Sequence, residues 1–396
     1  MNNAYKGWRR IQIVSYLLTV AILTACGGGG GGGSAGGSST GSSFTSGAIT
    51  GFGSVIINGI RFDDSSSSVS DDDDSSRSRD DLRLGMIAEV DGSTFSIDAS
   101  GGRRGTASAI RFGSEIVGPV SSISTSSLTV LGQTINVTDT TIFDDRFANG
   151  LASIQPGDVV EVHGLPGATA GQYTATRIEP KSNAQSYKLR GVISNLDTNL
   201  KTFAIGSETI SYANLSASDV PASLADGQRV RVKLQTTQVN GAWVATKIKI
   251  GVRSPGKHDE AELKGLITEF TSKFAFSVNG IAVDASNALF SKGDSGIVLG
   301  AHVEVEGSAV NGVIIAKKVK LESDDDIRSE GFELHGTISN LDTTAKAFTL
   351  RTLQVSYANF NGAEIGSLAN GVKVEVKGIP SADRTNLDAT RIKLED

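Results

Sequence analysis

Histidines are the side chains of this sequence with the widest chemistry, because they bind metals and transfer protons near neutral pH. The chain of 396 residues has four, and internal copies of the sequence test their positions. His163 occupies a position where other copies carry Glu306 and Lys377. His335 and His302 align in the same way with lysines and arginines. A strand position that accepts either charge is typical of a solvent-facing residue, so we predict surface histidines and no metal or catalytic site.

A glutamate recurs in a strand pattern of the form Gly-x-x-Val-Glu-Val-x-Gly. The neighbouring valines are expected to point inward, so the glutamate points outward. The next strand brings a basic residue to a matching position, which predicts cross-strand ion pairs worth about 0.2–1 kcal/mol rather than a carboxylate site. The residues concerned are Glu89, Glu161, Glu304 and Glu375, with Arg177, Lys318 and Arg391 as predicted partners. In the third copy Arg231 would face Lys247, which predicts a basic surface that this pattern does not explain.

An acidic run, Asp71 to Asp74, lies between serine-rich flanks where the other copies have the connection between their third and fourth strands. Several carboxylates on one loop could collect Ca²⁺. The run lacks the spaced ligands and the turn glycine of a defined calcium loop, so we predict a solvated, disordered segment instead.

Tyr212 and Tyr357 each stand in a Ser-Tyr-Ala-Asn segment. Exposed tyrosines of this kind could stack on a sugar or a base. The same position holds Phe62, Val137 and Val283 in other copies. An apolar position of this kind is typical of a hydrophobic core, which is the interpretation we favour.

Motifs of catalysis are missing from the sequence, which has no His-Glu-x-x-His and no phosphate-binding loop. We therefore expect no enzymatic activity, no catalytic residues and no cofactor. The net charge is −6 and the isoelectric point is near 5.4. Because a surface that binds phosphate backbones is normally basic, the charge argues against a nucleic-acid partner.

The elements that carry these residues repeat about every 70 residues, which indicates tandem modules. Each module has three alternating strands, a short connection and a two-strand hairpin, which is typical of antiparallel sheets. Five strands in about 65 residues favour an all-β fold of small five-stranded OB-like Greek-key barrels. Immunoglobulin-like sandwiches, which need about 100 residues, are the alternative. The predicted modules are residues 47–113, 114–182, 187–252, 261–322 and 332–396.

The amino-terminal segment has the order of an export signal, with basic residues followed by a short apolar run over residues 11–21. It ends in Leu-Thr-Ala-Cys at Cys26, the one cysteine of the chain. This motif resembles the lipobox of bacterial lipoproteins. The resemblance implies cleavage after residue 25, lipidation of Cys26, and anchoring in the membrane by acyl chains. The Gly/Ser-rich residues 26–46 then form a flexible tether. Cys26 is not followed by Asp, which in Gram-negative lipoproteins implies the outer membrane.

The first-module segment from Gly51 and the recurring hairpins resemble a family of repeated β domains of unknown function from bacterial envelope lipoproteins. The family implies the fold and a location in the cell envelope, and it brings no activity. We therefore expect a membrane-anchored, non-catalytic repeat scaffold or binding protein, whose partner is an envelope protein or a glycan. A carbohydrate-binding or adhesion protein is the alternative.

Overall fold

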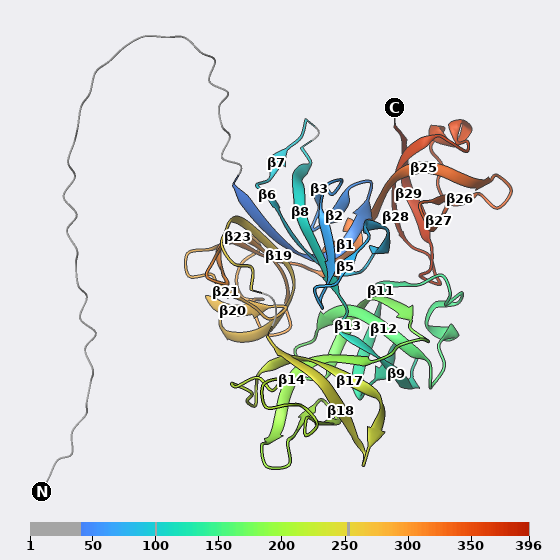
Figure 1. Ribbon diagram of the computed structural model, residues 1–396. Coiled ribbons are helices and arrows are strands. Elements are labelled where there is room, and N and C mark those ends of the chain that lie inside the picture. Colours follow the sequence, from blue (N-terminus) through green and yellow to red (C-terminus); the bar gives the residue numbers. More distant parts are fainter. Residues whose placement is uncertain (1–40, 100, 252–253, 396) are drawn as a thin grey trace, which may run out of the picture. The chain divides into compact units, whose positions relative to one another are not determined.

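The computed structural model describes residues 41–99, 101–251 and 254–395. The predicted signal peptide (1–25), the predicted lipidation site Cys26 and the predicted tether as far as residue 40 lie outside the described residues. β-Strands are the main secondary structure of the described residues, with one short α-helix and three 3-10 turns besides (Figure 1). None of the described helices is long and apolar enough to span a membrane.

Barrel 2 shows the topology that all five modules share. Its elements are β9 (Ile116–Ile123), β10 (Ser127–Val130), β11 (Gln133–Phe143), η2 (Gly150–Ser153), β12 (Val159–Pro166) and β13 (Gln172–Pro180). Antiparallel pairs join β9 to β10, β10 to β11, β12 to β13 and β12 back to β9. The third strand, β11, pairs in parallel with the fifth, β13, and this closes the barrel. The structure confirms the predicted five-stranded OB-type barrel.

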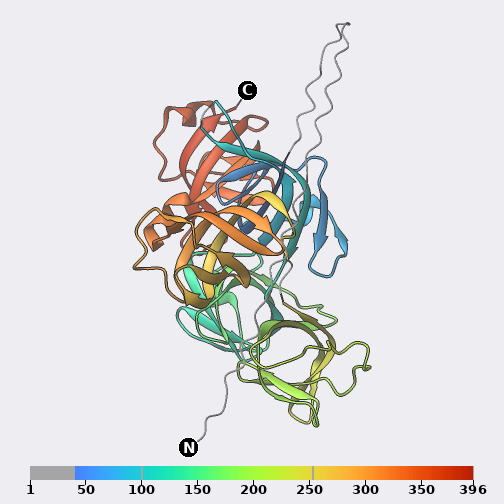
Figure 2. The ribbon, with the colours of Figure 1, turned by 90° about the vertical axis from the view of Figure 1, so that its left-hand side faces the viewer.

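Barrels 3, 4 and 5 close in the same way, through the parallel pairs β16–β18, β21–β24 and β27–β29. Figure 2 shows the closed outline of barrel 3 in yellow-green. Barrel 3 comprises β14 (Tyr187–Asp197), β15 (Thr202–Ile205), β16 (Glu208–Ser211), β17 (Arg229–Val239) and β18 (Ala242–Ile250). Barrel 4 comprises β19 (His258–Ser272), β20 (Ala275–Val278), β21 (Ile281–Asp284), β22 (Leu289–Phe290), β23 (His302–Val310) and β24 (Val313–Leu321). Barrel 5 comprises β25 (Phe332–Asp342), β26 (Ala347–Leu350), β27 (Leu353–Ser356), η3 (Ala363–Ser367), β28 (Lys373–Pro380) and β29 (Leu387–Leu394).

Barrel 1 has the same closure, with β3 parallel to β8, and a longer connection between its third and fourth barrel strands. Its barrel strands are β1 (Ser42–Phe52), β2 (Val55–Ile57), β3 (Ile60–Asp63), β6 (Ile87–Ser93) and β8 (Arg103–Gly113). The additional elements are β4 (Ser68–Asp71), β5 (Ser76–Arg77), η1 (Arg79–Asp81) and β7 (Ser96–Ile97). Residues 64–86, between β3 and β6, are called the acidic insert below.

Each hairpin positions its side chains by simple alternation. On β12, Val160 and Val162 are fully buried and pack with Ile178 of β13 in a core that continues into barrel 3. The intervening residues therefore lie on the outer face of the barrel. That outer face carries the charged residues of the recurring pattern.

Two predicted boundaries differ from the structure. β1 begins at Ser42, so the last residues of the predicted tether are strand, because Phe44 is completely buried in the core of barrel 4. β1 also pairs with β6 and β19, and this strand pairing extends to its amino-terminal residues. Similarly, β19 begins at His258, before the predicted start of the fourth module at residue 261. The residues between the predicted fourth and fifth modules form α1 (Asp324–Glu330), which Ser323 caps.

Candidate functional site

The acidic insert binds barrel 3 through its carboxylates. Asp72 is only 7% exposed, and its carboxylate lies 2.6 Å from Arg190, 2.7 Å from Arg231 and 3.3 Å from Lys188. Asp73 adds contacts of 2.7 Å to Arg231 and 2.5 Å to Lys233. The insert and the basic face of barrel 3 therefore neutralise each other.

This contact corrects the prediction of a solvated, disordered loop. The carboxylate of Asp71 accepts hydrogen bonds from the backbone N–H groups of Asp73 and Ser75, which folds the run into a turn. The side chain of Arg77 also binds Asp71, at 2.6 Å. Burial by itself would raise the pKa of Asp72, but the charges of Lys188, Arg190 and Arg231 outweigh burial and hold this pKa well below its usual range. The Asp72 carboxylate is therefore bound by basic side chains of barrel 3.

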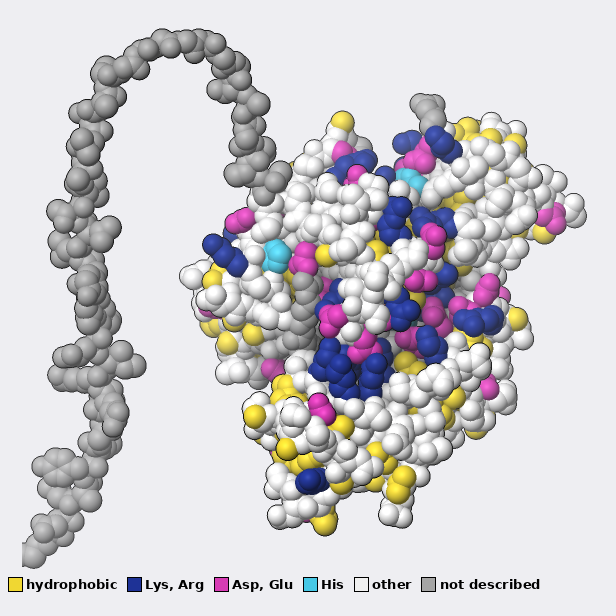
Figure 3. All heavy atoms as spheres, viewed as in Figure 1, with side chains coloured by type: hydrophobic (Ala, Val, Ile, Leu, Met, Phe, Trp, Pro, Cys, Tyr) yellow, Lys and Arg dark blue, Asp and Glu magenta, His cyan; other side chains and the backbone are white. Residues whose placement is uncertain are grey.

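A polar cleft of about 470 Å³ lies beside this contact. One part of its wall comes from the insert and barrel 3, and another comes from the outer face of β12 and β13. The side chains that matter here are Asp72, Lys188, Lys233, Glu161, His163 and Glu179. Figure 3 shows basic and acidic side chains gathered in a hollow of the face drawn there.

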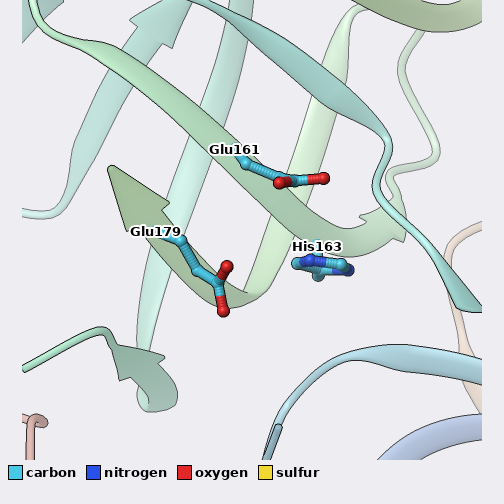
Figure 4. Close-up of side chains that lie close together, drawn as sticks. All are labelled: Glu161, His163 and Glu179. Carbon is cyan, nitrogen blue, oxygen red and sulfur yellow. The ribbon is translucent and has the colours of Figure 1, made fainter. Parts of the chain in front are cut away.

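Glu161, His163 and Glu179 form a cluster in this polar cleft (Figure 4). Glu161 and His163 project from β12, and Glu179 projects from the adjacent strand β13. One ligand atom from each residue lies within 4.8 Å of one from each of the others. We call these three residues the barrel 2 cluster.

The hairpin register differs from the prediction. The predicted partner of Glu161 was Arg177, but Arg177 lies opposite His163, and Glu161 lies opposite Glu179. In the other modules the residues directly opposite the glutamates are basic, in the pairs Glu89–Arg111, Glu304–Lys320 and Glu375–Lys393. The predicted ion pair between Glu375 and Arg391 nevertheless forms diagonally across the hairpin, at 3.2 Å. In barrel 3, Arg231 lies opposite Lys249 rather than Lys247. Sequence alternation defines the outer face of each strand but not the pair that meets across the hairpin.

His163 is only 1% exposed, which corrects the prediction of a surface histidine. Its Nδ1 lies 3.1 Å from the carbonyl oxygen of Gly113, at the end of β8, so neighbouring chain covers the outer face of the hairpin. Its Nε2 is buried and has no hydrogen-bond partner among the described residues. Burial lowers the pKa of His163, which favours the neutral ring.

The two carboxylates of the barrel 2 cluster have cationic neighbours. Glu161 accepts a hydrogen bond from the Ser114 hydroxyl at 2.8 Å and pairs with Lys181 at 2.6 Å. Burial alone would raise the pKa of Glu161, but the nearby basic groups of His163, Lys188 and Lys181 outweigh burial and lower it. Glu179 pairs with Arg177, whose guanidinium also lies 3.1 Å from Asp144.

His335 in barrel 5 is also buried, against the surface prediction, but its environment differs from that of His163. Its Nδ1 lies 2.7 Å from Glu395 and its Nε2 lies 2.8 Å from Glu333. Burial alone would lower the pKa of His335, but the hydrogen bonds to Glu333 and Glu395 outweigh burial and raise it. Both ring nitrogens are therefore committed to carboxylates.

The remaining candidates have structural positions. His258 is half-buried, with its Nε2 3.4 Å from Asp91, and His302 is also half-buried. Tyr212 and Tyr357 are buried in the cores of their barrels, as predicted. Cys26 lies outside the described residues.

Sequence reasoning missed Glu179, although a signal for it exists. The equivalent position in the other four modules holds Arg111, Lys249, Lys320 and Lys393. An acidic residue at a position that is otherwise basic marks barrel 2 as the exception. Arg231 is the matching exception in barrel 3, at the position that is otherwise Glu.

The repeated closure of the barrels defines a tandem array of OB-type domains. A family described as "Domain of unknown function (DUF5666)" matches residues 117–179, 190–249, 264–320 and 335–393, which is more than half of the chain. The chain belongs to this family. These four segments correspond to barrels 2 to 5, and the match confirms the predicted resemblance to a repeated domain of unknown function.

Two further comparisons add little. Among solved structures, a chain titled "drosophila Unr CSD456" is 17% identical in sequence, over 43% of this chain and 79% of that chain, with a TM-score of 0.14. No curated protein matches the chain.

Proposed function

We propose that this protein is a lipid-anchored scaffold of the bacterial cell envelope, which holds several OB-type barrels together and catalyses no reaction. The observation that carries the proposal is the contact between the acidic insert of barrel 1 and the basic face of barrel 3. The carboxylates of the acidic insert and the basic residues of barrel 3 therefore join two modules of the same chain. Strand pairs between barrels, such as β1 with β19 and β9 with β14, support the same role.

The anchor in this proposal is Cys26, which follows the lipobox-like Leu23-Thr24-Ala25. Several acyl chains on one residue hold a protein at a membrane far more firmly than a single chain, since each buried methylene adds about 0.8 kcal/mol. The glycine-rich residues that follow Cys26 have the composition of a flexible tether. The outer membrane is the proposed location, because Asp is missing after Cys26.

Metabolic labelling with a fatty-acid analogue tests the anchor. In a Gram-negative host the full chain should carry the label and sediment with outer membranes, and Cys26→Ser should lose both. Ser34→Ala, a change within the Gly/Ser tract, is the control and should label normally. Label that persists in Cys26→Ser would refute the anchor.

The scaffold role predicts a protein partner in the envelope. Cross-linking in cells followed by purification of the full chain should recover a recurrent envelope protein, and the same protein should bind the purified chain directly. Binding to a glycan array in place of such a protein would favour the carbohydrate-binding alternative. Turnover of an envelope substrate that a single substitution abolishes would contradict the non-catalytic role.

A further inference from the structure

We propose that the barrel 2 cluster, Glu161, His163 and Glu179, is a binding site for a divalent transition-metal ion, with Zn²⁺ as the best match. The cluster offers one imidazole nitrogen and two carboxylates from adjacent strands, within 4.8 Å of one another. Three protein ligands of these types, with a water molecule completing the set, are typical of Zn²⁺ sites. An imidazole ligand favours a transition metal over Ca²⁺ or Mg²⁺, which prefer oxygen ligands alone.

The first line of support is the state of the His163 ring. Its Nδ1 lies at hydrogen-bond distance from the Gly113 carbonyl oxygen, which can only accept, so Nδ1 carries the proton and donates. Metal-binding histidines usually hold one ring N–H in this way, on a backbone carbonyl or a carboxylate. Nε2 is then the nitrogen with a lone pair, and it is buried without a hydrogen-bond partner among the described residues. A buried polar atom without a partner destabilises the folded state, and a bound cation would remove that penalty.

The second line of support is the direct opposition of Glu161 and Glu179 across the hairpin. Like charges directly opposite each other destabilise a sheet. Barrels 1, 4 and 5 avoid this by placing Arg111, Lys320 or Lys393 opposite the recurring glutamate. Among the five copies, barrel 2 alone has carboxylates on both sides, and a histidine beside them. A cation bound between the two strands would compensate the negative charges of Glu161 and Glu179.

The cations already near the cluster leave room for a metal. Lys181 pairs with Glu161, but its side chain is 50% exposed and can turn into water. Arg177 keeps its contact with Asp144 when Glu179 turns toward a metal. Lys188 is engaged by Asp72 of the acidic insert. Each carboxylate can therefore be released without leaving a buried charge unpaired.

Isothermal titration of the full chain with ZnCl₂, after treatment with a chelator, tests the site. We expect one Zn²⁺ bound per chain. His163→Gln removes the imidazole, and Glu179→Gln removes one carboxylate with little change in size. Each should weaken Zn²⁺ binding by at least about 100-fold, since loss of even an outer-sphere partner costs a metal site about 10- to 100-fold. His302→Gln changes a histidine outside the cluster and should bind as the native chain does.

A second measurement keeps the test decisive if a variant folds poorly. Co²⁺ bound to the native chain should give visible absorption bands that report its ligands, and Zn²⁺ should displace it. Native secondary structure, measured by circular dichroism, qualifies each variant for comparison. Failure of the native chain to bind either metal would overturn the proposal. Equal binding by His163→Gln and the native chain, or loss of binding in His335→Gln instead, would also overturn it.

Discussion

The hairpins of barrels 2 and 3 both lack the pairing of acidic with basic residues that the other three hairpins have, and they depart from it with opposite charges. In the hairpins of barrels 1, 4 and 5 a glutamate on the fourth barrel strand faces a basic residue on the fifth. Barrel 3 places Arg231 opposite Lys249, so that both residues are basic. Barrel 2 places Glu161 opposite Glu179, so that both are acidic.

The structure shows how one of these exceptions is resolved. The basic pair of barrel 3 meets the acidic insert, whose Asp72 and Asp73 contact Arg231, while Asp74 lies 3.3 Å from Lys249. The opposite charge is thus supplied by another module of the same chain. In barrel 3 the like-charge pair thus marks a surface that another module covers. In barrel 2 the two glutamates pair with Lys181 and Arg177, and we have proposed that a metal ion binds between them.

The largest effect is expected from removing the contact between Asp72 and the basic residues of barrel 3. Asp72→Ala removes the buried carboxylate that Lys188, Arg190 and Arg231 share, and the remaining contact of Arg231 with Asp73 compensates only part of this buried charge. The change should lower the free energy of unfolding by about 3–5 kcal/mol. Urea denaturation of the full chain measures this loss. The exposed Asp80, in the same insert, is the control, and Asp80→Ala should change stability by less than about 0.5 kcal/mol.

A double-mutant cycle sharpens that result. Arg231→Ala combined with Asp72→Ala should cost less than the sum of the two single changes, by about 0.5–3 kcal/mol, because the residues share one contact. Strict additivity would contradict a direct energetic coupling between Asp72 and Arg231.

A smaller effect is expected at the acidic pair of barrel 2, Glu161 and Glu179. In the presence of a chelator, Lys181→Ala should lower the free energy of unfolding by about 0.2–1 kcal/mol, since its ion pair with Glu161 is partly exposed. The same change should strengthen Zn²⁺ binding, because it frees Glu161. Lys317→Ala, at an exposed lysine of β24, should leave Zn²⁺ binding as it is. Weaker Zn²⁺ binding by Lys181→Ala would contradict the competition between lysine and metal.

The subtlest effect is a difference in pH dependence between two buried histidines. The pKa of His163 is lowered, so its contribution to stability is present above the unfolded pKa of about 6.5 and is lost as pH falls through the folded pKa. The pKa of His335 is raised, so its contribution is present below about 6.5 and is lost as pH rises through the folded pKa.

Stability curves between pH 5 and 8, with a chelator present, check these opposite signs. As pH falls, the advantage of the native chain over His163→Gln should shrink, while its advantage over His335→Gln should grow. Slopes of the same sign would show that the two rings share one kind of environment.

The repeated sequence was sufficient to predict the barrel and its strand order, because inward residues such as Val160 and Val162 alternate in every copy. It was not sufficient to predict which outer faces are covered. His163 looked solvent-facing because it lies on the outside of its own barrel, and its burial comes from chain beyond that barrel. Contacts between modules depend on packing that no repeat pattern encodes. Asp72 and Arg231 could nevertheless have been matched, since each is an exception in its own module and their charges are opposite.

The position of β1 has a consequence for the order in which the protein folds. The backbone N–H of Ser42 donates a hydrogen bond to the side-chain carboxylate of Asp259, 217 residues further along the chain, and Phe44 is buried in the core of barrel 4. During synthesis from the amino terminus, one edge of β1 and the ring of Phe44 therefore stay exposed until barrel 4 has been synthesised. An unpaired strand edge beside an exposed aromatic ring is a site where unfinished chains associate. Fragments that stop after barrel 3 should therefore aggregate, whereas the finished chain closes this edge with its own later strand.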